Sequence, residues 1–437
     1  MSGSRSEGSQ PPAQQAPTQP YPAVLGVARH GRLKKAGPWG ALIGIIATVL
    51  AVALVSTSAV AAVAVGTLIG NFHHSGQGPR LHSALPAPPT IGAYPGGFNI
   101  LIVGSDTRVG QGGIGGSTDT SILNDVTMLL HVSGDHTNAT AVSFPRDMIV
   151  PIAACAVGGG LQAPMNTALY YGGSNDKSPG AGLPCAVKTV EQFTGIPIQF
   201  AGLITFTGVI EVTDAVGGVP VCVVGNINDP EVGLHLKAGT HKLSGLRALK
   251  FLRSRHGVGD GSDLGRISSQ QVYLSSLVRT LKSGNTLSNI PELYKIADAA
   301  TKNMELSQGF DSPDTLFAIA QALKNIPLNR VIFTQYPGTT GGVGIYAGKV
   351  QPLLGPGNAL IAQIKSNKPF KLGVAVGNRG SVAGTAPKGS KSSSGSTSPS
   401  TSTPSPTSTA PAKNVTVLNG VIGQSSSQYT CTRAFEQ

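Results

Sequence analysis

A long apolar segment near the N-terminus sets the first constraint on how this chain can fold. Residues 39–70 are mostly Ala, Val, Leu, Ile and Gly, and none of them is charged. A helix needs about 20 apolar residues to cross a bilayer, whereas the apolar part of a cleaved signal peptide has only about 7 to 15. A buried core helix of this length would also carry polar side chains. The segment is therefore predicted to be a transmembrane helix.

The charges on either side of this segment predict its orientation. Arg29, Arg32, Lys34 and Lys35 precede it, whereas Arg80 and two His residues follow it. Because cytoplasmic flanks carry the excess of Lys and Arg, the N-terminus is expected in the cytoplasm. We therefore expect a single-pass protein of the cell membrane whose remaining chain is extracytoplasmic.

Composition divides the rest of the chain. Only 12% of the residues are charged, and Gly and Pro number 58 and 31, so part of the chain is too poor in apolar side chains to fold. The expected organisation is a disordered tail at 1–38, the membrane helix at 39–70, a spacer at 71–96, a folded domain at 97–340, a Gly/Ser/Thr/Pro-rich linker at 341–413 and a short final segment at 414–437 with one strand.

Within 97–340, β-branched runs alternate with amphipathic stretches, which predicts an α/β domain with a central mixed sheet flanked by helices. Strands are expected at 98–103, 126–132, 140–144, 199–204, 219–224 and 330–335. Helices are expected at 165–171, 185–194, 206–216, 245–255, 263–281, 291–303 and 313–325.

Several functional classes are disfavoured. The four Cys residues form no C-x-x-C pair, which argues against a structural zinc site. No G-K-[ST] or G-x-S-x-G motif is present, which argues against a nucleotide P-loop and a serine hydrolase elbow. The net charge of +12 suits nucleic acid, an anionic membrane or a phosphate-bearing substrate. Since the folded domain is expected outside the cell, nucleic acid is not expected as a partner.

Polar residues gather at the ends of the expected strands. Asp106 and Arg108 follow the first, Asp125 lies at the start of the second, and Arg146 and Asp147 follow the third. Ligands in α/β proteins bind where strand ends converge, so these side chains are expected at one mouth. The alternative is a set of solvated turn residues.

A second polar cluster lies between two expected helices. Arg253 and Arg255 end one helix, and Asp263 starts the next. Arg266 and Gln270 share a face with Asp263, at i+3 and i+7. Three guanidinium groups form a clamp suited to phosphate oxygens; a salt-bridge network with the neighbouring Asp residues is the alternative. Arg beside carboxylates suits a diphosphate with Mg²⁺, and outside the cell, without ATP, a lipid-linked diphosphate is the expected donor.

Six motifs in this order resemble the LytR-CpsA-Psr family of bacterial cell-envelope proteins: N-I-L-I-V-G-S-D-T-R, N-D-V-T-M-L-L-H-V, S-F-P-R-D-M-I-V-P-I, D-A-V-G-G-V-P-V, A-G-T-H-K-L-S-G and F-L-R-S-R-H-G…D-L-G-R-I-S-S-Q-Q. They cover residues 97–285. V-T-V-L-N-G near the C-terminus resembles the opening of the LytR C-terminal domain, here truncated. The resemblance implies a Mg²⁺-dependent phosphotransferase that moves a glycopolymer from an undecaprenyl-diphosphate carrier to peptidoglycan.

The resemblance also assigns roles by position. It implies catalytic roles for Asp106, Arg146, Arg253 and Arg255, diphosphate binding by Arg108, Arg146, Arg253, Arg255, Arg266 and Gln270, and Mg²⁺ binding by Asp106 and Asp125. Leu123 and Asn124 stand where many members have Arg-Ser, and Ser269 stands where many have Arg. Two alternatives stay open. The first is a prenyl-diphosphate pyrophosphatase, in which the same site uses water as the acceptor. The second, suggested by the missing Arg positions, is a non-catalytic protein that binds or regulates wall polymers.

The cysteines allow one disulfide to be predicted. Oxidation is permitted outside the membrane, and Cys155 with Cys185 is the preferred pair. Cys222 is expected as a core residue of an apolar strand, and Cys431 is expected to be exposed.

Overall fold

The computed structural model describes residues 95–105, 107, 122–175, 178–284, 286–374, 379–385 and 415–435. The predicted membrane segment at 39–70, the tail before it, Asp106 and Arg108 lie outside these ranges. Among the helices that the structure describes, none has both the length and the apolar character needed to cross a bilayer.

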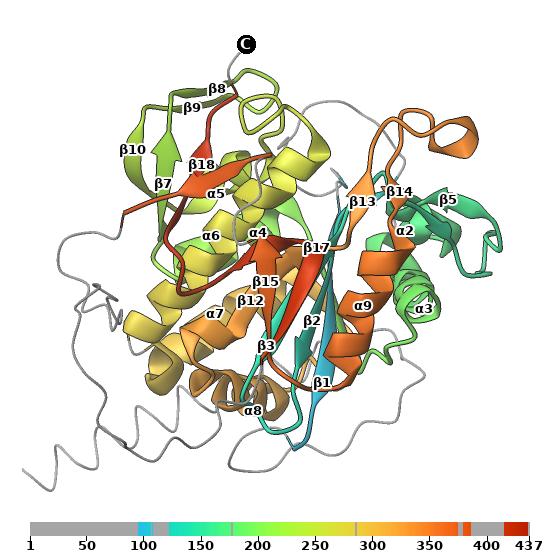
Figure 1. Ribbon diagram of the computed structural model, residues 1–437. Coiled ribbons are helices and arrows are strands. Elements are labelled where there is room, and N and C mark those ends of the chain that lie inside the picture. The colour runs from blue at the N-terminus through green and yellow to red at the C-terminus, as the bar shows by residue number, and fades with distance from the viewer. Residues whose placement is uncertain are drawn as a thin grey trace, which may run out of the picture. The chain divides into compact units, whose positions relative to one another are not determined.

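An eight-stranded mixed sheet forms the centre of the domain (Figure 1). Its order is β11-β6-β1-β2-β3-β12-β17-β15. The strands are β1 (Phe98–Ser105), β2 (Asn124–Val132), β3 (Ala139–Phe144), β6 (Phe200–Ile204), β11 (Met304–Leu306), β12 (Val331–Gln335), β15 (Phe370–Val374) and β17 (Thr416–Ser425). β1–β2 and β2–β3 are antiparallel, and β1–β6 and β3–β12 are parallel. The predicted central mixed sheet is confirmed.

The helices lie on both faces of this sheet (Figure 1). They are α2 (Ala168–Tyr171), α3 (Leu183–Thr194), α4 (Phe206–Ala215), α5 (Gly245–Arg253), α6 (Asp263–Ser283), α7 (Ile290–Asn303), α8 (Pro313–Lys324) and α9 (Leu354–Lys365). Short 3₁₀ helices occur at Met165–Thr167, Pro179–Gly182, Thr286–Ser288, Leu328–Arg330 and Gly344–Tyr346. All seven helices expected from the sequence are present, with ends shifted by a few residues.

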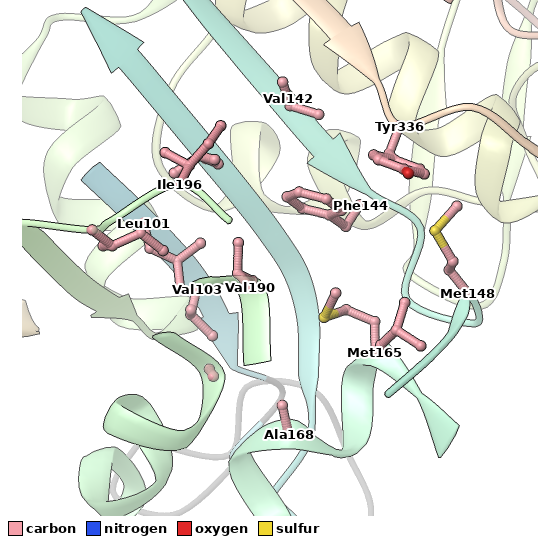
Figure 2. Close-up of a cluster of buried hydrophobic side chains, with 14 of the residues drawn as sticks. Leu101, Val103, Val142, Phe144, Met148, Met165, Ala168, Val190, Ile196 and Tyr336 are labelled. Carbon is pink, nitrogen blue, oxygen red and sulfur yellow. The ribbon is translucent and has the colours of Figure 1, made fainter. Parts of the chain in front are cut away.

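The alternation of side chains along β1 explains the two-sided packing. Leu101 and Val103 point into one core with α3 and α9, whereas Phe98 and Ile100 point into the other with α8. Successive strand residues face opposite sides of a sheet, so an apolar run of this length needs cover on both faces. In the first core the ring of Phe144 stacks on Tyr336, with centroids 5.6 Å apart (Figure 2).

A second, four-stranded sheet packs on α5 and α6. Its order is β10-β7-β18-β16, with β7 (Val219–Val224), β10 (Gly239–Leu243), β16 (Ser381–Ala383) and β18 (Thr430–Arg433). Three two-stranded ribbons complete the strands: β4 (Ile149–Pro151) with β5 (Gln162–Pro164), β8 (Ile227–Asp229) with β9 (Leu234–Leu236), and β13 (Gly338–Thr339) with β14 (Gln351–Pro352).

The C-terminal part of the chain belongs to these sheets, which corrects the expected organisation. Residues 344–374 and 379–385, assigned to the linker, form α9, β15 and β16. The last segment supplies two strands instead of one: β17 pairs with β12 and β15, and β18 pairs with β7 and β16. β15, β16 and β18 have only three to five residues each, too few to show a clear alternation. In β17, Gly420 and Gly423 interrupt the apolar pattern, so only its start was predicted as a strand.

Two disulfides link the described residues. The predicted bond between Cys155 and Cys185 is confirmed. The expectations for the other two cysteines were wrong, because Cys222 and Cys431 form a second bond and Cys431 is only 3% exposed. These two residues lie opposite each other in the parallel pair β7–β18. The bond was missed because β18 itself was not predicted.

Candidate functional site

The strand ends converge as the sequence predicted. Ser105 at the end of β1 pairs with Asn124 at the start of β2, and Phe144 at the end of β3 pairs with Thr127. This register brings Asp125 and Arg146 to one edge of the sheet, where they form an ion pair. Asp106 and Arg108, expected at the same edge, lie outside the described residues.

Arg146 lies among three carboxylates. Besides Asp125, its Nε is 3.7 Å from Oδ2 of Asp147, and its backbone N–H donates to Oδ2 of Asp263 at 3.3 Å. Burial by itself lowers the pKa of Arg146, but the negative charges of Asp125, Asp147 and Asp263 outweigh it and raise the pKa above its ordinary value. The guanidinium therefore stays charged at this edge, held by Asp125 and beside Asp147.

The start of α6 brings a second Arg to the same place. Ser262 caps the helix by accepting the N–H of Gly265 at 3.2 Å. One turn on, Nη2 of Arg266 lies 2.6 Å from Oδ1 of Asp263 and donates to the backbone oxygen of Asp125 at 2.9 Å. Arg266 therefore forms the salt bridge to a neighbouring Asp that was the alternative to a phosphate clamp. The same side chain also lines the cavity described below.

A buried carboxylate shapes the loop after α5. Asp229 is fully buried, and its Oδ2 accepts hydrogen bonds from Oγ of Ser254 at 2.7 Å, from the N–H of Arg255 at 3.0 Å and from the N–H of Gly257 at 3.1 Å. The loop is thereby fixed directly after Arg253, the last residue of α5.

Arg253 and Arg255 have different environments in the structure. The Arg253 guanidinium lies 4.2 Å from the ring centroid of Phe206, and both residues line the cavity. Arg255 is not among the described residues that line it. Of the three Arg residues predicted to form a clamp, Arg253 and Arg266 line the cavity. Arg146 lies next to the cavity, because it is ion-paired with Asp125, which also lines it.

The cavity that these residues border has a volume of about 280 Å³. It opens between the sheet and helices α4, α5 and α6, and its lining is largely apolar. The apolar side chains are Ile102, Val126, Met128, Ile204, Val209, Val212, Leu249, Leu252, Leu274 and Leu277. Asp125, Arg253, Arg266 and Gln270 are the charged and amide groups in the described lining. Gln270 is oriented by a 2.9 Å bond from its Nε2 to the backbone oxygen of Leu252.

Sequence reasoning missed three residues of this site. Phe206 is the first residue of α4, shortly after β6, and Asp229 is the last residue of β8. Tyr273 follows Gln270 by three residues on α6. Tyr273 is 1% exposed and lines the cavity, and its hydroxyl has no hydrogen-bond partner within the described ranges. Burial raises the pKa of this hydroxyl, so it remains a donor. The i, i+4, i+7 spacing of Arg266, Gln270 and Tyr273 was the available signal.

Two of the departures from the family pattern are buried. Asn124 donates through Nδ2 to Oγ1 of Thr127 and to the backbone oxygen of Met165, and its Oδ1 accepts the N–H of Leu169. Ser269 is 1% exposed and is not among the cavity-lining residues that the structure describes. The Asn124 side chain therefore links β2 to the segment 165–169, which explains an amide at this buried position.

Comparison with known proteins gives the family. A sequence model of the LytR_cpsA_psr family matches residues 80–355. The chain belongs to this family. It is 31% identical over 281 residues to the cell wall biosynthesis protein LcpA of Corynebacterium glutamicum, covering 59% of this chain and 53% of LcpA. It is also 31% identical to the polyisoprenyl-teichoic acid–peptidoglycan teichoic acid transferase TagU of Enterococcus faecalis, covering 49% of this chain and 62% of TagU. The matches thus span about half of LcpA and less than two thirds of TagU.

The fold has a solved counterpart. Protein gbs0355 of Streptococcus agalactiae superposes with a TM-score of 0.50 at 22% identity, covering 62% of this chain and 88% of that one. At this identity the likeness concerns the fold alone.

Proposed function

We propose that this protein transfers a glycopolymer from a polyprenyl-diphosphate carrier to peptidoglycan. The observation that carries the proposal is the division of the cavity, whose walls are largely apolar and whose charged and amide groups are Asp125, Arg253, Arg266 and Gln270. A polyprenyl diphosphate has the same division, an apolar chain attached to a multiply charged head. The transferase activity in the name of TagU supports the same substrate class.

Each half of the site suits one half of this substrate. Apolar walls favour a prenyl chain by about 25 cal/mol per Å² of apolar surface removed from water. At the polar end, Arg253 and Arg266 present planar donor groups that match phosphate oxygens. Arg253 is already placed by its contact with Phe206, so little side-chain freedom is lost on binding.

The reaction proposed is a phosphoryl transfer. A hydroxyl oxygen of peptidoglycan attacks the phosphorus that carries the glycopolymer, and the bond from this phosphorus to the bridging oxygen breaks. Prenyl monophosphate leaves, the hydroxyl proton is released, and the polymer remains joined to peptidoglycan through a phosphodiester. Arg253 and Arg266 hold the phosphate oxygens and offset the charge that develops on them.

Mg²⁺ is proposed as the cofactor, and the residues present fit it. No group of three His, Cys, Asp or Glu gathers in the described part of the chain, but Mg²⁺ commonly uses one or two carboxylates and takes its other ligands from phosphates and water. Asp125 supplies one carboxylate at the cavity, and Asp106, directly after Ser105, is the proposed second. Bound there, the ion would neutralise charge on the diphosphate.

We also propose that residues 39–70 anchor the protein in the cell membrane, with the N-terminus inside and the enzyme domain outside. The charge asymmetry around this segment supports the orientation. In intact cells, a tag at the N-terminus should resist external protease while a tag after Gln437 is cleaved. An N-terminal tag that is cleaved would refute this topology.

An Arg-to-Lys substitution tests the proposed function. Arg253→Lys keeps the charge but loses the planar fork, so transfer of labelled polymer to peptidoglycan by the full-length protein should fall about tenfold to hundredfold. Arg247→Lys is the matched control, because Arg247 lies exposed on the same helix α5 and away from the cavity. Equal rates in both variants would contradict the role of Arg253.

A further inference from the structure

A second hollow lies on a neighbouring face of α6 and is not part of the site described above. It has a volume of about 540 Å³, within the range of ligand pockets. Ser276, Arg279, Thr280 and Ser283 of α6 line it, whereas the first cavity uses Tyr273, Leu274 and Leu277 of the same helix. The other walls come from β7, β10, β18, Leu328, Thr385 and Tyr429. We call this hollow the β18 groove.

The β18 groove holds two cations without a carboxylate. Arg279 donates through Nη1 to the backbone oxygens of Ser426 at 2.8 Å and Gln428 at 3.0 Å. Lys282 donates through Nζ to the last carbonyls of α8, Leu323 at 3.3 Å and Lys324 at 2.6 Å. No acidic residue is among the groove's described lining, and neither cation has an ion pair within the described ranges.

These two charges are partly removed from water. Burial lowers the pKa of both Arg279 and Lys282, because carbonyl oxygens compensate a charge less well than bulk water does. A bound anion would supply the missing countercharge. The segment 386–414 that follows Thr385, a lining residue, contains three Lys and no acidic residue, so its own charge does not complement the groove.

The remaining lining suits a saccharide. Hydroxyl side chains predominate, and a hydroxyl can both donate to and accept from a sugar. Thr430 is 4% exposed, and its Oγ1 has no hydrogen-bond partner in the residues that the structure describes. Tyr429 also lines the groove, and its ring positions the Arg279 guanidinium, which lies 4.6 Å from the ring centroid. The Cys222–Cys431 bond holds two walls, β7 and β18, together, so the groove is formed before a ligand arrives.

We propose that the β18 groove is a second binding site, which takes a phosphate-bearing saccharide segment of the glycopolymer. The proposal rests on the proposed function, because it assumes that a glycopolymer is the substrate of the first site. Arg279 and Lys282 pair with the phosphate, and Thr430 bonds to a sugar hydroxyl. The hydroxyls of Ser276 and Thr280 already donate to the backbone oxygens of Pro220 and Ser276, so they accept from the sugar. The two sites share α6, so a polymer held by its diphosphate would be held a second time farther along.

Direct binding tests the proposal without relying on catalysis. The probe is N-acetylglucosamine 6-phosphate, titrated into the full-length protein in detergent by isothermal calorimetry. We expect saturable binding that weakens at least tenfold in Lys282→Met and in Thr430→Val. Thr430→Val replaces a hydroxyl that has no partner in the described residues by a side chain of similar shape, so the fold should survive. Lys302→Met, which removes an exposed lysine of α7 that pairs with Asp298, is the matched control and should bind as the parent does.

Other outcomes would overturn the proposal. These are no saturable binding, equal binding in all variants, or equally tight binding of inorganic phosphate alone, which would reduce the groove to a simple anion site. Geranyl diphosphate titrated into the same samples reports on the first cavity. If it binds normally while the sugar phosphate does not, the second site is refuted and the proposed function is left standing.

Discussion

We expect the affinity of the protein for prenyl diphosphates to rise with chain length until the chain fills the cavity beside Arg253 and Arg266. A group the size of a water molecule occupies about 30 Å³, so 280 Å³ accommodates about nine carbon atoms, or about two isoprene units. Each buried methylene contributes about 0.8 kcal/mol. Affinity should therefore rise by up to about 1000-fold from a five-carbon to a ten-carbon diphosphate, and then by less than about tenfold up to twenty carbons.

A substitution inside the cavity should shorten this range. Val209 of α4 lines the cavity and is partly exposed, so Val209→Phe places about four more carbon atoms in it. Displacing the same number of prenyl carbons costs about 3 kcal/mol, or roughly 100-fold in the Kd of geranyl diphosphate measured by calorimetry. Isopentenyl diphosphate should lose much less. Val224→Phe, at a position 47% exposed on β7, is the matched control. If affinity did not depend on chain length, or if both variants behaved alike, the cavity would not be the prenyl site.

Three further predictions concern stability and the metal. Replacing Cys222 and Cys431 by Ser should lower the free energy of unfolding, measured with denaturant, by about 5 kcal/mol in the chain-entropy model, since the bond spans 209 residues; a loss smaller than that of removing the 30-residue disulfide would contradict that model. Burial lowers the pKa of His131, so the unfolded chain takes up this proton more readily than the folded protein below about pH 6.5. The unfolding free energy should therefore fall between pH 7.5 and 5.5, and it should fall more in the parent than in His131→Gln. Parallel pH profiles of the two proteins would refute this. Asp125→Asn should raise the Mg²⁺ concentration that gives half-maximal transfer, because Mg²⁺ prefers carboxylate oxygen, and an unchanged Mg²⁺ dependence would remove Asp125 as a ligand.

Much of the fold could be predicted because its strongest elements carry strong local patterns. The run from Phe98 to Ser105 is almost continuously apolar and rich in β-branched residues, and the helix from Asp263 to Ser283 is long with apolar residues at helical spacing, so their type followed from the sequence. The C-terminal strands carry weaker patterns: the start of β17 was predicted as a strand, whereas β15, β16 and β18 are too short to be recognised. Gln424 of β17 is an example, because a polar side chain in this position does not predict burial. It can be buried since its Nε2 donates to the backbone oxygen of Gln271 and to Oγ of Ser275 on α6. Only the tertiary structure shows that this Ser-rich face of α6 is covered.

The candidate site was predictable to the extent that its residues lie at the ends of elements. Asp125 and Arg146 follow from strand register, and Arg266 and Gln270 follow from helical spacing. Asp229 could not be found in this way, because its function as an acceptor for the Arg255 loop depends on contacts between segments 26 residues apart. The cavity was also hidden, since side chains such as Leu274 and Leu277 have the spacing of ordinary core residues.

The fate of the glycopolymer tests the central claim most directly. The full-length protein would be incubated with Mg²⁺, peptidoglycan and a polyprenyl-diphosphate-linked polymer labelled in its sugars. After muramidase digestion, the label should be found by mass analysis in muropeptides joined through a phosphodiester, with one prenyl monophosphate released for each polymer attached. Label released into solution would instead indicate a hydrolase, and unchanged substrate that remains tightly bound would indicate a binding protein. Either result would contradict the transferase.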